Sequence, residues 1–275
     1  MIPAAMALAL STLAPNAQAE EGPPAGWVGP PPGWSGGVLV GASSAPRYEG
    51  SRDTRVGPVL GGEVTYRSMA FGSVAAGSRG LVWTPFQSPV GSASLGLSVD
   101  PGRVDNDDRK LTPAGQRPGS ADLRGMGEVE MTALVSASGS LALGPASLTG
   151  ALRQAVSSHR GTLVDVGLAL PWKLHRHATL TLTPGLTWAS ARHMQAYFGV
   201  TPQQSAASGF AAFDAGAGLK SHSLVLDFDM AFSRYWHLNA VLRAHRLQGD
   251  AADSPITQRR HQTSGMLALR YEFQL

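Results

Sequence analysis

The sequence predicts an all-β protein, a transmembrane antiparallel up-and-down β-barrel of about 12 strands. Three observations support this prediction. Polar and apolar residues alternate with a period of two over many segments, as they do in strands with two different faces. Only 15% of the residues are charged, fewer than in typical soluble domains, yet the mean hydropathy is close to zero at −0.04. The connections between these segments alternate between short and long, which is typical of bacterial outer-membrane barrels.

The first 35 residues are expected to precede the barrel. A short apolar stretch leads to Ala17-Gln18-Ala19, an A-x-A pattern that predicts a signal peptide over 1–19. Residues 20–35 are rich in Pro and Gly and are expected to form an extended periplasmic leader. The barrel is then expected to occupy 36–275. No later segment holds a long enough apolar run for a transmembrane helix.

The alternation is clearest in the segment 219–233. Leu224 and Phe228 fall on one face, and Asp227 and Asp229 fall on the opposite face. A helix would scatter these residues around its surface, whereas a strand separates them. In a barrel the apolar face contacts lipid and the polar face lines the lumen, which explains the low hydropathy. Segments of this kind are expected to form strands near 36–43, 57–66, 68–77, 79–86, 90–99, 128–142, 146–155, 161–171, 178–189, 219–233, 235–247 and 263–275.

The connections predict which rim of the barrel carries the long loops. Long connections are expected at 44–56, 100–127, 156–160, 190–218 and 248–262, and short ones at 67, 87–89, 143–145, 172–177 and 234. The link near Ser78 breaks the rule, because it is short where a long loop is due. An even number of strands places both termini on the short-turn side, which is periplasmic in outer-membrane barrels.

The last segment carries a second signal. Leu267, Leu269, Tyr271 and Phe273 alternate with polar residues up to the C-terminus. Such a strand resembles the signal that the barrel-assembly machinery reads during insertion. Several aromatic residues also fall near strand ends, where the girdles of a membrane barrel belong. They are Trp83, Trp172, Trp188, Trp236 and Tyr271.

Several segments resemble the MipA/OmpV family, the MltA-interacting outer-membrane proteins. The matching segments are 48–51 followed by Arg55 and Pro58, then 123–128, 197–202, 204–209 and 249–256. The resemblance covers about 36–273, and 197–209 is its most specific part. It implies an outer-membrane barrel. The best-known member is a scaffold that links a murein lytic transglycosylase to a peptidoglycan synthase, and other members are porin-like or adhesive. The family offers no catalytic residues or cofactor to carry over.

The loop around Tyr197 is the best candidate for a family-specific role. It could fold into the lumen, present a contact patch to a partner, or form a packed structural plug, and the sequence leaves these alternatives open. Its candidate residues are Tyr197, Phe198, Gly199, Thr201, Pro202, Gln204 and Ser205.

A second candidate group is polar and should face the lumen. It consists of Asp227, Asp229, His237, Arg243 and His245. Asp and His together could serve a barrel hydrolase. An ion-pair network that satisfies buried charges is the favoured interpretation. The sequence contains no G-x-S-x-G, H-E-x-x-H, P-loop or Rossmann motif, so no catalytic residue is assigned and no enzyme is expected.

Two smaller clusters contain residue types that can bind metal ions. The run from Asp105 to Asp108 lacks the spacing of an EF-hand and has basic neighbours, so a solvated loop is favoured. His175 and His177 have no third ligand nearby, so a polar turn near lipid headgroups is favoured. No metal or cofactor is therefore expected. The net charge of +3 comes without a basic cluster, which gives no support for nucleic-acid binding.

Three functions remain in view. The first is an outer-membrane scaffold of a Gram-negative cell, with periplasmic termini, that contacts a murein hydrolase and a peptidoglycan synthase. The second is a porin-like passive channel or an adhesive surface protein, and the third is a barrel hydrolase. All three share outer-membrane lipid and the assembly machinery as partners.

Overall fold

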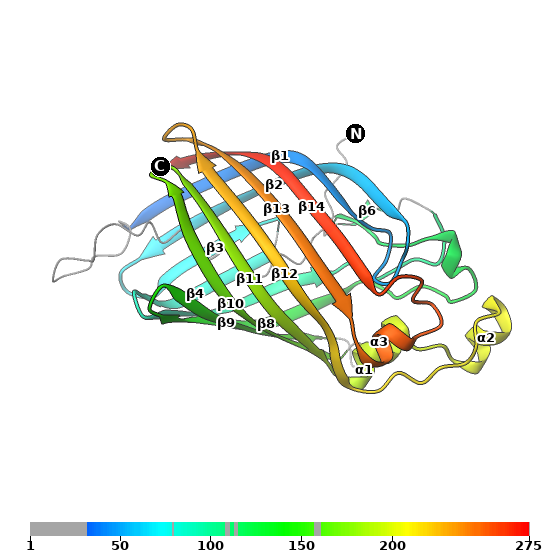
Figure 1. Cartoon of the computed structure of the whole chain (residues 1–275). Coiled ribbons are helices and arrows are strands. Elements are labelled where there is room, and N and C mark those ends of the chain that lie inside the picture. Colours follow the sequence, from blue (N-terminus) through cyan, green and yellow to red (C-terminus); the bar gives the residue numbers. More distant parts are fainter. Residues whose placement is uncertain (1–31, 79, 108–110, 113–114, 157–160, 275) are drawn as a thin grey trace.

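The computed structural model describes residues 32–78, 80–107, 111–112, 115–156 and 161–274. These residues form a closed antiparallel barrel of 12 strands (Figure 1), which confirms the predicted fold class. The expected signal peptide and most of the expected leader lie outside the described residues. Within the described ranges, no helix is both long and apolar enough to cross a membrane.

Each barrel strand coincides with a predicted segment, and the bounds differ by a few residues. The strands are β1 (Gly33–Pro46), β2 (Thr54–Ser68), β3 (Gly72–Gly77), β4 (Gly80–Ser88), β5 (Gly91–Asp100), β8 (Thr132–Leu143), β9 (Ala146–Ala155), β10 (Thr162–His175), β11 (Ala178–Ala189), β12 (Gly218–Ala231), β13 (Trp236–Leu247) and β14 (His261–Gln274). Neighbours in sequence pair with each other, and β1 pairs with β14 to close the seam, with Gly36 opposite Phe273.

Three predicted bounds are wrong by four residues: β3 begins at Gly72 and not at 68, β10 continues to His175 and not only to 171, and β8 begins later than the predicted 128. The strand β8 begins only at Thr132. Val129 instead forms an isolated bridge with Arg103, inside the loop that follows β5. The residues before Thr132 alternate in polarity but pair within this loop, so alternation alone placed the strand start too early.

The two faces of the barrel differ as expected. Leu224, Phe232 and Leu267 are exposed on the outside at 43%, 55% and 56%, as lipid-facing side chains must be. Asp227 and Asp229 point inward and are part-buried. The lumen is therefore the polar side of the sheet.

The long connections gather at one end of the barrel, and the C-terminus lies at the other end (Figure 1). They contain the small elements β6 (Leu111–Thr112), β7 (Gly115–Gln116), η1 (Ala121–Leu123), α1 (Ala191–Phe198), α2 (Pro202–Ser208) and α3 (Gly249–Asp253). We call this end the long-loop end and the opposite one the short-turn end. The β3–β4 link is the exception that the sequence indicated, because it is short on the long-loop side.

Candidate functional site

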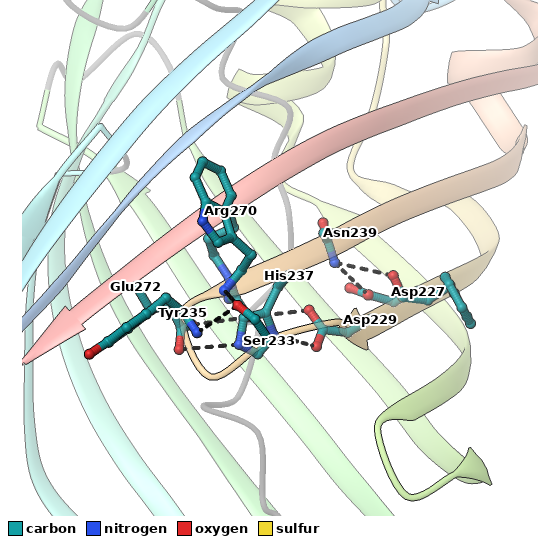
Figure 2. A network of polar contacts seen from close by, with 10 residues as sticks. Asp227, Asp229, Ser233, Tyr235, His237, Asn239, Arg270 and Glu272 are labelled. Atoms are coloured by element: carbon teal, nitrogen blue, oxygen red, sulfur yellow. Dashed lines mark hydrogen bonds and ion pairs between the residues drawn. The ribbon is translucent and has the colours of Figure 1, made fainter.

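A polar network in the lumen joins three neighbouring strands near the short-turn end (Figure 2). Asp229 on β12 accepts from Nδ1 of His237 on β13 at 3.1 Å and from Nη2 of Arg270 on β14 at 3.2 Å. Glu272 lies 3.1 Å from Arg270 and 3.5 Å from Nε2 of His237. Asn239 donates to Asp227 at 3.1 Å. Arg270 thus contacts both carboxylates of the network, Asp229 and Glu272, and His237 lies between the same two groups.

The geometry of His237 bears on the hydrolase interpretation. Its Nδ1 faces Asp229, as the histidine of a catalytic triad faces its aspartate. Its Nε2, however, faces the Glu272 carboxylate rather than a hydroxyl. Both ring nitrogens of His237 therefore face carboxylates, as in an ion-pair network.

The predicted lumenal residues do not form one group. His245 lies further along β13, where its Nε2 is 3.0 Å from Oε1 of Gln262 on β14. Arg243 is part-buried and lies along β13 between His245 and His237. A strand rises about 3.3 Å per residue, so eight residues place His245 about 26 Å from His237 along β13. Facing the same lumen did not bring these side chains together.

A part-buried ion pair lies at the long-loop end. Nζ of Lys220 donates to both carboxylate oxygens of Glu49, at 2.8 and 2.9 Å. Burial alone would raise the pKa of Glu49, but Lys220 and then His245 favour the carboxylate and lower the pKa to about 2. Close by, Gln262 accepts from the backbone of Gly50 and donates to the carbonyl of Ser51.

The long loops pack into one compact body, which we call the loop cluster. Its buried core includes Tyr48, Leu123, Met126, Val200 and Ile256, which come from four different loops. A second buried group, with Met194 and Phe198, connects this core to the rim of the barrel. The hydroxyl of Tyr48 donates to the carbonyl of Ile256 at 3.0 Å. Burial, followed by the charge of Asp122, raises the pKa of Tyr48 to about 12.

Arg103 ties the loop after β5 to the Tyr197 loop. Its Nη1 donates to the carbonyl of Tyr197 at 2.7 Å, and the Tyr197 hydroxyl donates to Asp100 at 2.7 Å. Burial lowers the pKa of Arg103 to about 10, so it stays charged at neutral pH. The ring of Tyr197 also stacks on His193, with centroids 4.7 Å apart.

The rest of the candidate loop turns mainly inward. Phe198, Gly199 and Val200 are buried. Thr201 caps α2 by accepting from the backbone of Gln204, and Gln204 donates to the carbonyl of Met126 at 2.6 Å. Pro202 is the exposed first residue of α2, and Ser205 is half-buried.

The packing of the loop cluster explains why position 125 is a glycine. Gly125 has a φ of +88°, and a Cβ there would lie 2.6 Å from the carbonyl oxygen of Ala207 in α2. Only glycine allows both this backbone conformation and this close approach.

The described aspartates of the run from Asp105 to Asp108 contact other parts of the protein. Asp107 pairs with Arg47, and Asp105 accepts from the backbone of Gly127. Asp108 lies outside the described residues. His175 and His177 are exposed in their turn, with ring centroids 5.9 Å apart. Within the described ranges, no group of three His, Asp or Glu residues could hold a metal ion.

Sequence reasoning missed several partners at both ends. Asn239, Arg270 and Glu272 share the polar face of their strands with the predicted residues, so the alternation could have added them. Glu49 and Lys220 carried no local signal, because they lie 171 positions apart in the chain.

The segments that carry the family resemblance meet in space. Residues of 48–51, 123–128, 197–202 and 249–256 all contribute to the buried core or hydrogen bonds of the loop cluster. The resemblance therefore concerns a specific packed body, in addition to the barrel pattern.

Comparisons with known proteins concern the barrel fold and the family of the chain. The barrel resembles several solved outer-membrane structures. OmpT of Vibrio cholerae is 8% identical with a TM-score of 0.35, and the match covers 87% of this chain and 97% of that chain. The translocator domain of the autotransporter NalP of Neisseria meningitidis is 12% identical with a TM-score of 0.41, and the match covers 89% of this chain and 90% of that chain. The NanC porin is 6% identical with a TM-score of 0.43, and the match covers 86% of this chain and 98% of that chain. At these identities the likeness concerns the fold alone. A search of curated proteins finds no significant match. The family model described as MltA-interacting protein MipA matches residues 38–273. The chain therefore belongs to the MipA family.

Proposed function

We propose that this protein is an outer-membrane scaffold whose short-turn end contacts a murein hydrolase of the MltA kind. The observation that carries the proposal is membership of the MipA family over 38–273, since the family description is interaction with MltA. In the proposed orientation the signal peptide is removed, and the leader and both termini lie in the periplasm. The long-loop end then faces the cell exterior. A peptidoglycan synthase is the second proposed partner.

The short-turn end offers a suitable contact surface. Lys173 near the end of β10 is exposed, as are Arg176 and Arg234 in the turns that follow β10 and β12. The backbone of Ala231 donates to the carbonyl of His177 at 2.9 Å, which holds these turns side by side. None of the five short turns, 69–71, 89–90, 144–145, 176–177 and 232–235, contains an Asp or Glu. We call Lys173, Arg176 and Arg234 the basic rim. This positive surface favours a partner with an acidic surface.

The proposal treats the protein as a binding partner rather than an enzyme. The contacts of His237 support this, because both ring nitrogens face carboxylates. They serve to satisfy buried charge, and no bound substrate is required to explain them.

Affinity capture from detergent-solubilised membranes tests the scaffold role. The full-length protein is expected to recover MltA-type hydrolase. A triple variant, Lys173→Glu, Arg176→Glu and Arg234→Glu, is expected to lose it. The matched control reverses three exposed arginines of the long loops, Arg52, Arg124 and Arg259, and is expected to retain it. No recovery by the unaltered protein would refute the scaffold, and equal recovery by both variants would refute the basic rim as the contact.

A passive channel is the second candidate function. The polar lumen favours it, because residues such as Ser92, Ser94, Ser138 and Ser140 line the wall opposite the charged network. Planar-bilayer recording is the direct measurement. Steady conductance by the purified barrel would support this role, and its complete absence would remove it.

A further inference from the structure

Three neighbouring strands of the barrel, β12, β13 and β14 (Figure 1), each carry a basic side chain at the long-loop end. His222 lies directly opposite Arg246, and Arg246 lies directly opposite His261. All three side chains are exposed, whereas the adjoining Ser221 and Gln262 are buried. We call His222, Arg246 and His261 the outer row.

The alternation of the strands fixes the direction of the outer row. His222 is two residues from Leu224, which faces outward, and His261 is an even number of residues from the outward Leu267. The positions between them face the lumen, where Nε2 of His245 lies 3.0 Å from Oε1 of Gln262. The outer row therefore points away from the lumen, toward the surroundings of the barrel wall.

The height of the outer row places it at an edge of the apolar band. Ten residues of β13 separate Arg246 from Trp236, which packs on Tyr271 in the aromatic girdle of the short-turn end. Ten residues span about 33 Å along a strand. With the usual tilt of roughly 35–45°, this corresponds to a height of about 25 Å, which is the height of the apolar band of such barrels. The outer row thus lies at the headgroup level of the opposite leaflet.

The outer row has no protein partner in the part of the chain that the structure describes. None of its three side chains forms a hydrogen bond, an ion pair or a ring contact there. The acidic side chains of the adjoining loop are engaged elsewhere. Asp250 accepts from the backbone of Gly216, and Asp253 pairs with Arg260.

This arrangement is unfavourable without an anion. Arg246 carries a positive charge, and each histidine carries one when it is protonated. Like charges directly opposite each other on one face destabilise a sheet. An anion bound between them would replace the repulsion with attraction.

The outward positions of other strands at the same end are uncharged. On β8, β9 and β10 they include Ala133, Gln154 and Val164. The basic residues are therefore a local feature of β12, β13 and β14, and a general need for solubility at this end does not explain them.

The surroundings of the outer row indicate the kind of anion. Leu224 and Leu242 lie on the same strands toward the middle of the apolar band and are exposed at 43% and 48%. Trp188, beside the row on β11, is 42% exposed, as expected of an aromatic residue near headgroups. A guanidinium group binds phosphate through two parallel hydrogen bonds. A lipid with a phosphate head and acyl chains would therefore contact the charges and the apolar side chains together. An acidic protein would have to approach through the leaflet.

We propose that the outer row binds the phosphate of a phosphorylated lipid in the leaflet at the long-loop end, with its acyl chains against Leu224 and Leu242. The proposal rests on the proposed function only for the assignment of this leaflet as the outer one. It makes no use of the basic rim.

Native mass spectrometry of the full chain in neutral detergent tests the binding. The probe is phosphatidic acid, compared with phosphatidylcholine that has the same acyl chains. The unaltered protein is expected to retain phosphatidic acid about tenfold more strongly, and Arg246→Gln should remove most of this preference. Equal retention of the two lipids by the unaltered protein would overturn the proposal.

Two further variants separate the site from general charge attraction. Arg246→Lys keeps the charge and should keep most of the preference. Arg124→Gln removes one exposed charge from a long loop and should keep all of it. Equal losses in Arg246→Gln and Arg124→Gln would assign the preference to net charge and overturn the site. Heat-modifiable gel mobility checks that each variant is folded.

A soluble competitor distinguishes a lipid from a free phosphate. Glycerol 3-phosphate has the head but no acyl chains, so an equal concentration should leave the bound phosphatidic acid in place. Its displacement would show a site for free phosphate and overturn the lipid assignment.

The location of the lipid can be measured because the chain contains no cysteine. A fluorophore on Leu224→Cys, in phosphatidylcholine vesicles, should be quenched more by phosphatidic acid with a nitroxide on its acyl chain than by phosphatidylcholine with the same label. Val135→Cys, at an exposed outward position of β8, should show no such difference. The same difference at both positions would overturn the placement. Hydrolase capture by Arg246→Gln should stay normal, so failure of the lipid site and failure of the scaffold role are separate results.

Discussion

The two ends of the barrel differ in how the connections between the strands are packed. At the long-loop end, side chains from four loops bury Tyr48, Leu123, Val200 and Ile256 in a common core. At the short-turn end, the turns are two to four residues long and almost every side chain is exposed. The first end thus has a core of its own, whereas the second is positioned only by the strands beneath it. A sequence signature accumulates where packing is specific, which explains why the family segments lie in the loops.

The largest expected effect tests whether the loop cluster has a core of its own. Phe198→Ala removes a fully buried ring, which typically costs about 3–5 kcal/mol. The long loops should then become sensitive to trypsin, while the barrel keeps its heat-modifiable gel mobility. Phe86→Ala, on the exposed outer face, is the control and should leave the loops resistant. Loss of the barrel itself in Phe198→Ala would show that the two parts are one folding unit.

A second test concerns the Glu49–Lys220 pair. Lys220→Met leaves the part-buried carboxylate of Glu49 without its partner, and breaking a fully buried pair typically costs about 3–5 kcal/mol. Partial exposure of Glu49 places the expected loss near the lower limit. Urea unfolding monitored by loop proteolysis measures it. The double variant with Glu49→Gln should recover part of the loss, and a double variant worse than the sum of the single ones would contradict the pairing.

The same pair predicts a pH dependence of the loop cluster. The pKa of Glu49 is lowered to about 2 from its ordinary value of 4.5, so its contribution to stability is complete above pH 4.5. That contribution, about 2–3 kcal/mol, is lost as the pH falls from 4.5 toward 2. Glu49→Gln should flatten this part of the profile. An unchanged profile in Glu49→Gln would assign the acid sensitivity to other groups.

The lumenal network near the short-turn end should behave independently of the loops. Asp229→Asn removes the charge that His237 and Arg270 share, with an expected cost of about 2 kcal/mol in barrel unfolding. Trypsin resistance of the long loops should not change. A simultaneous loss of loop resistance would show that the two ends are coupled through the wall.

The smallest expected effect concerns the N-cap of α2. Thr201→Ala removes the side-chain acceptor for the backbone of Gln204, at about 1 kcal/mol. Hydrogen exchange of the α2 amides should quicken, while exchange in α1 stays the same. Faster exchange across both helices would mean that α2 has no stability of its own.

The strands could be predicted because their signal is local. Alternation in β12 and β14 is visible within ten residues, and a shift by one residue would turn Leu224 or Leu267 into the lumen. The loop cluster could not be predicted in the same way. Its contacts join distant positions, and Tyr48 and Ile256 are 208 apart in the chain.

The candidate lumenal site could be predicted in part, better than the loop cluster but less completely than the strands. Asp229 and His237 were predicted on one face and do meet. The alternation places Arg270 on the lumenal face as well, but only the register of β13 against β14 puts it opposite His237, so its contact could not be predicted. His245 was included because it shares that face, but distance along the strand separates it from the network.

The seam between β1 and β14 has a consequence for how the molecule is made. Gly36 can pair with Phe273 only after nearly the whole polypeptide has been made, so β1 has no partner on this side until β14 is in place. Such distant pairing is intrinsically slow, and until it is complete two bare edges remain open to unwanted association. A chaperone that shields both edges until the last strand docks would meet this need.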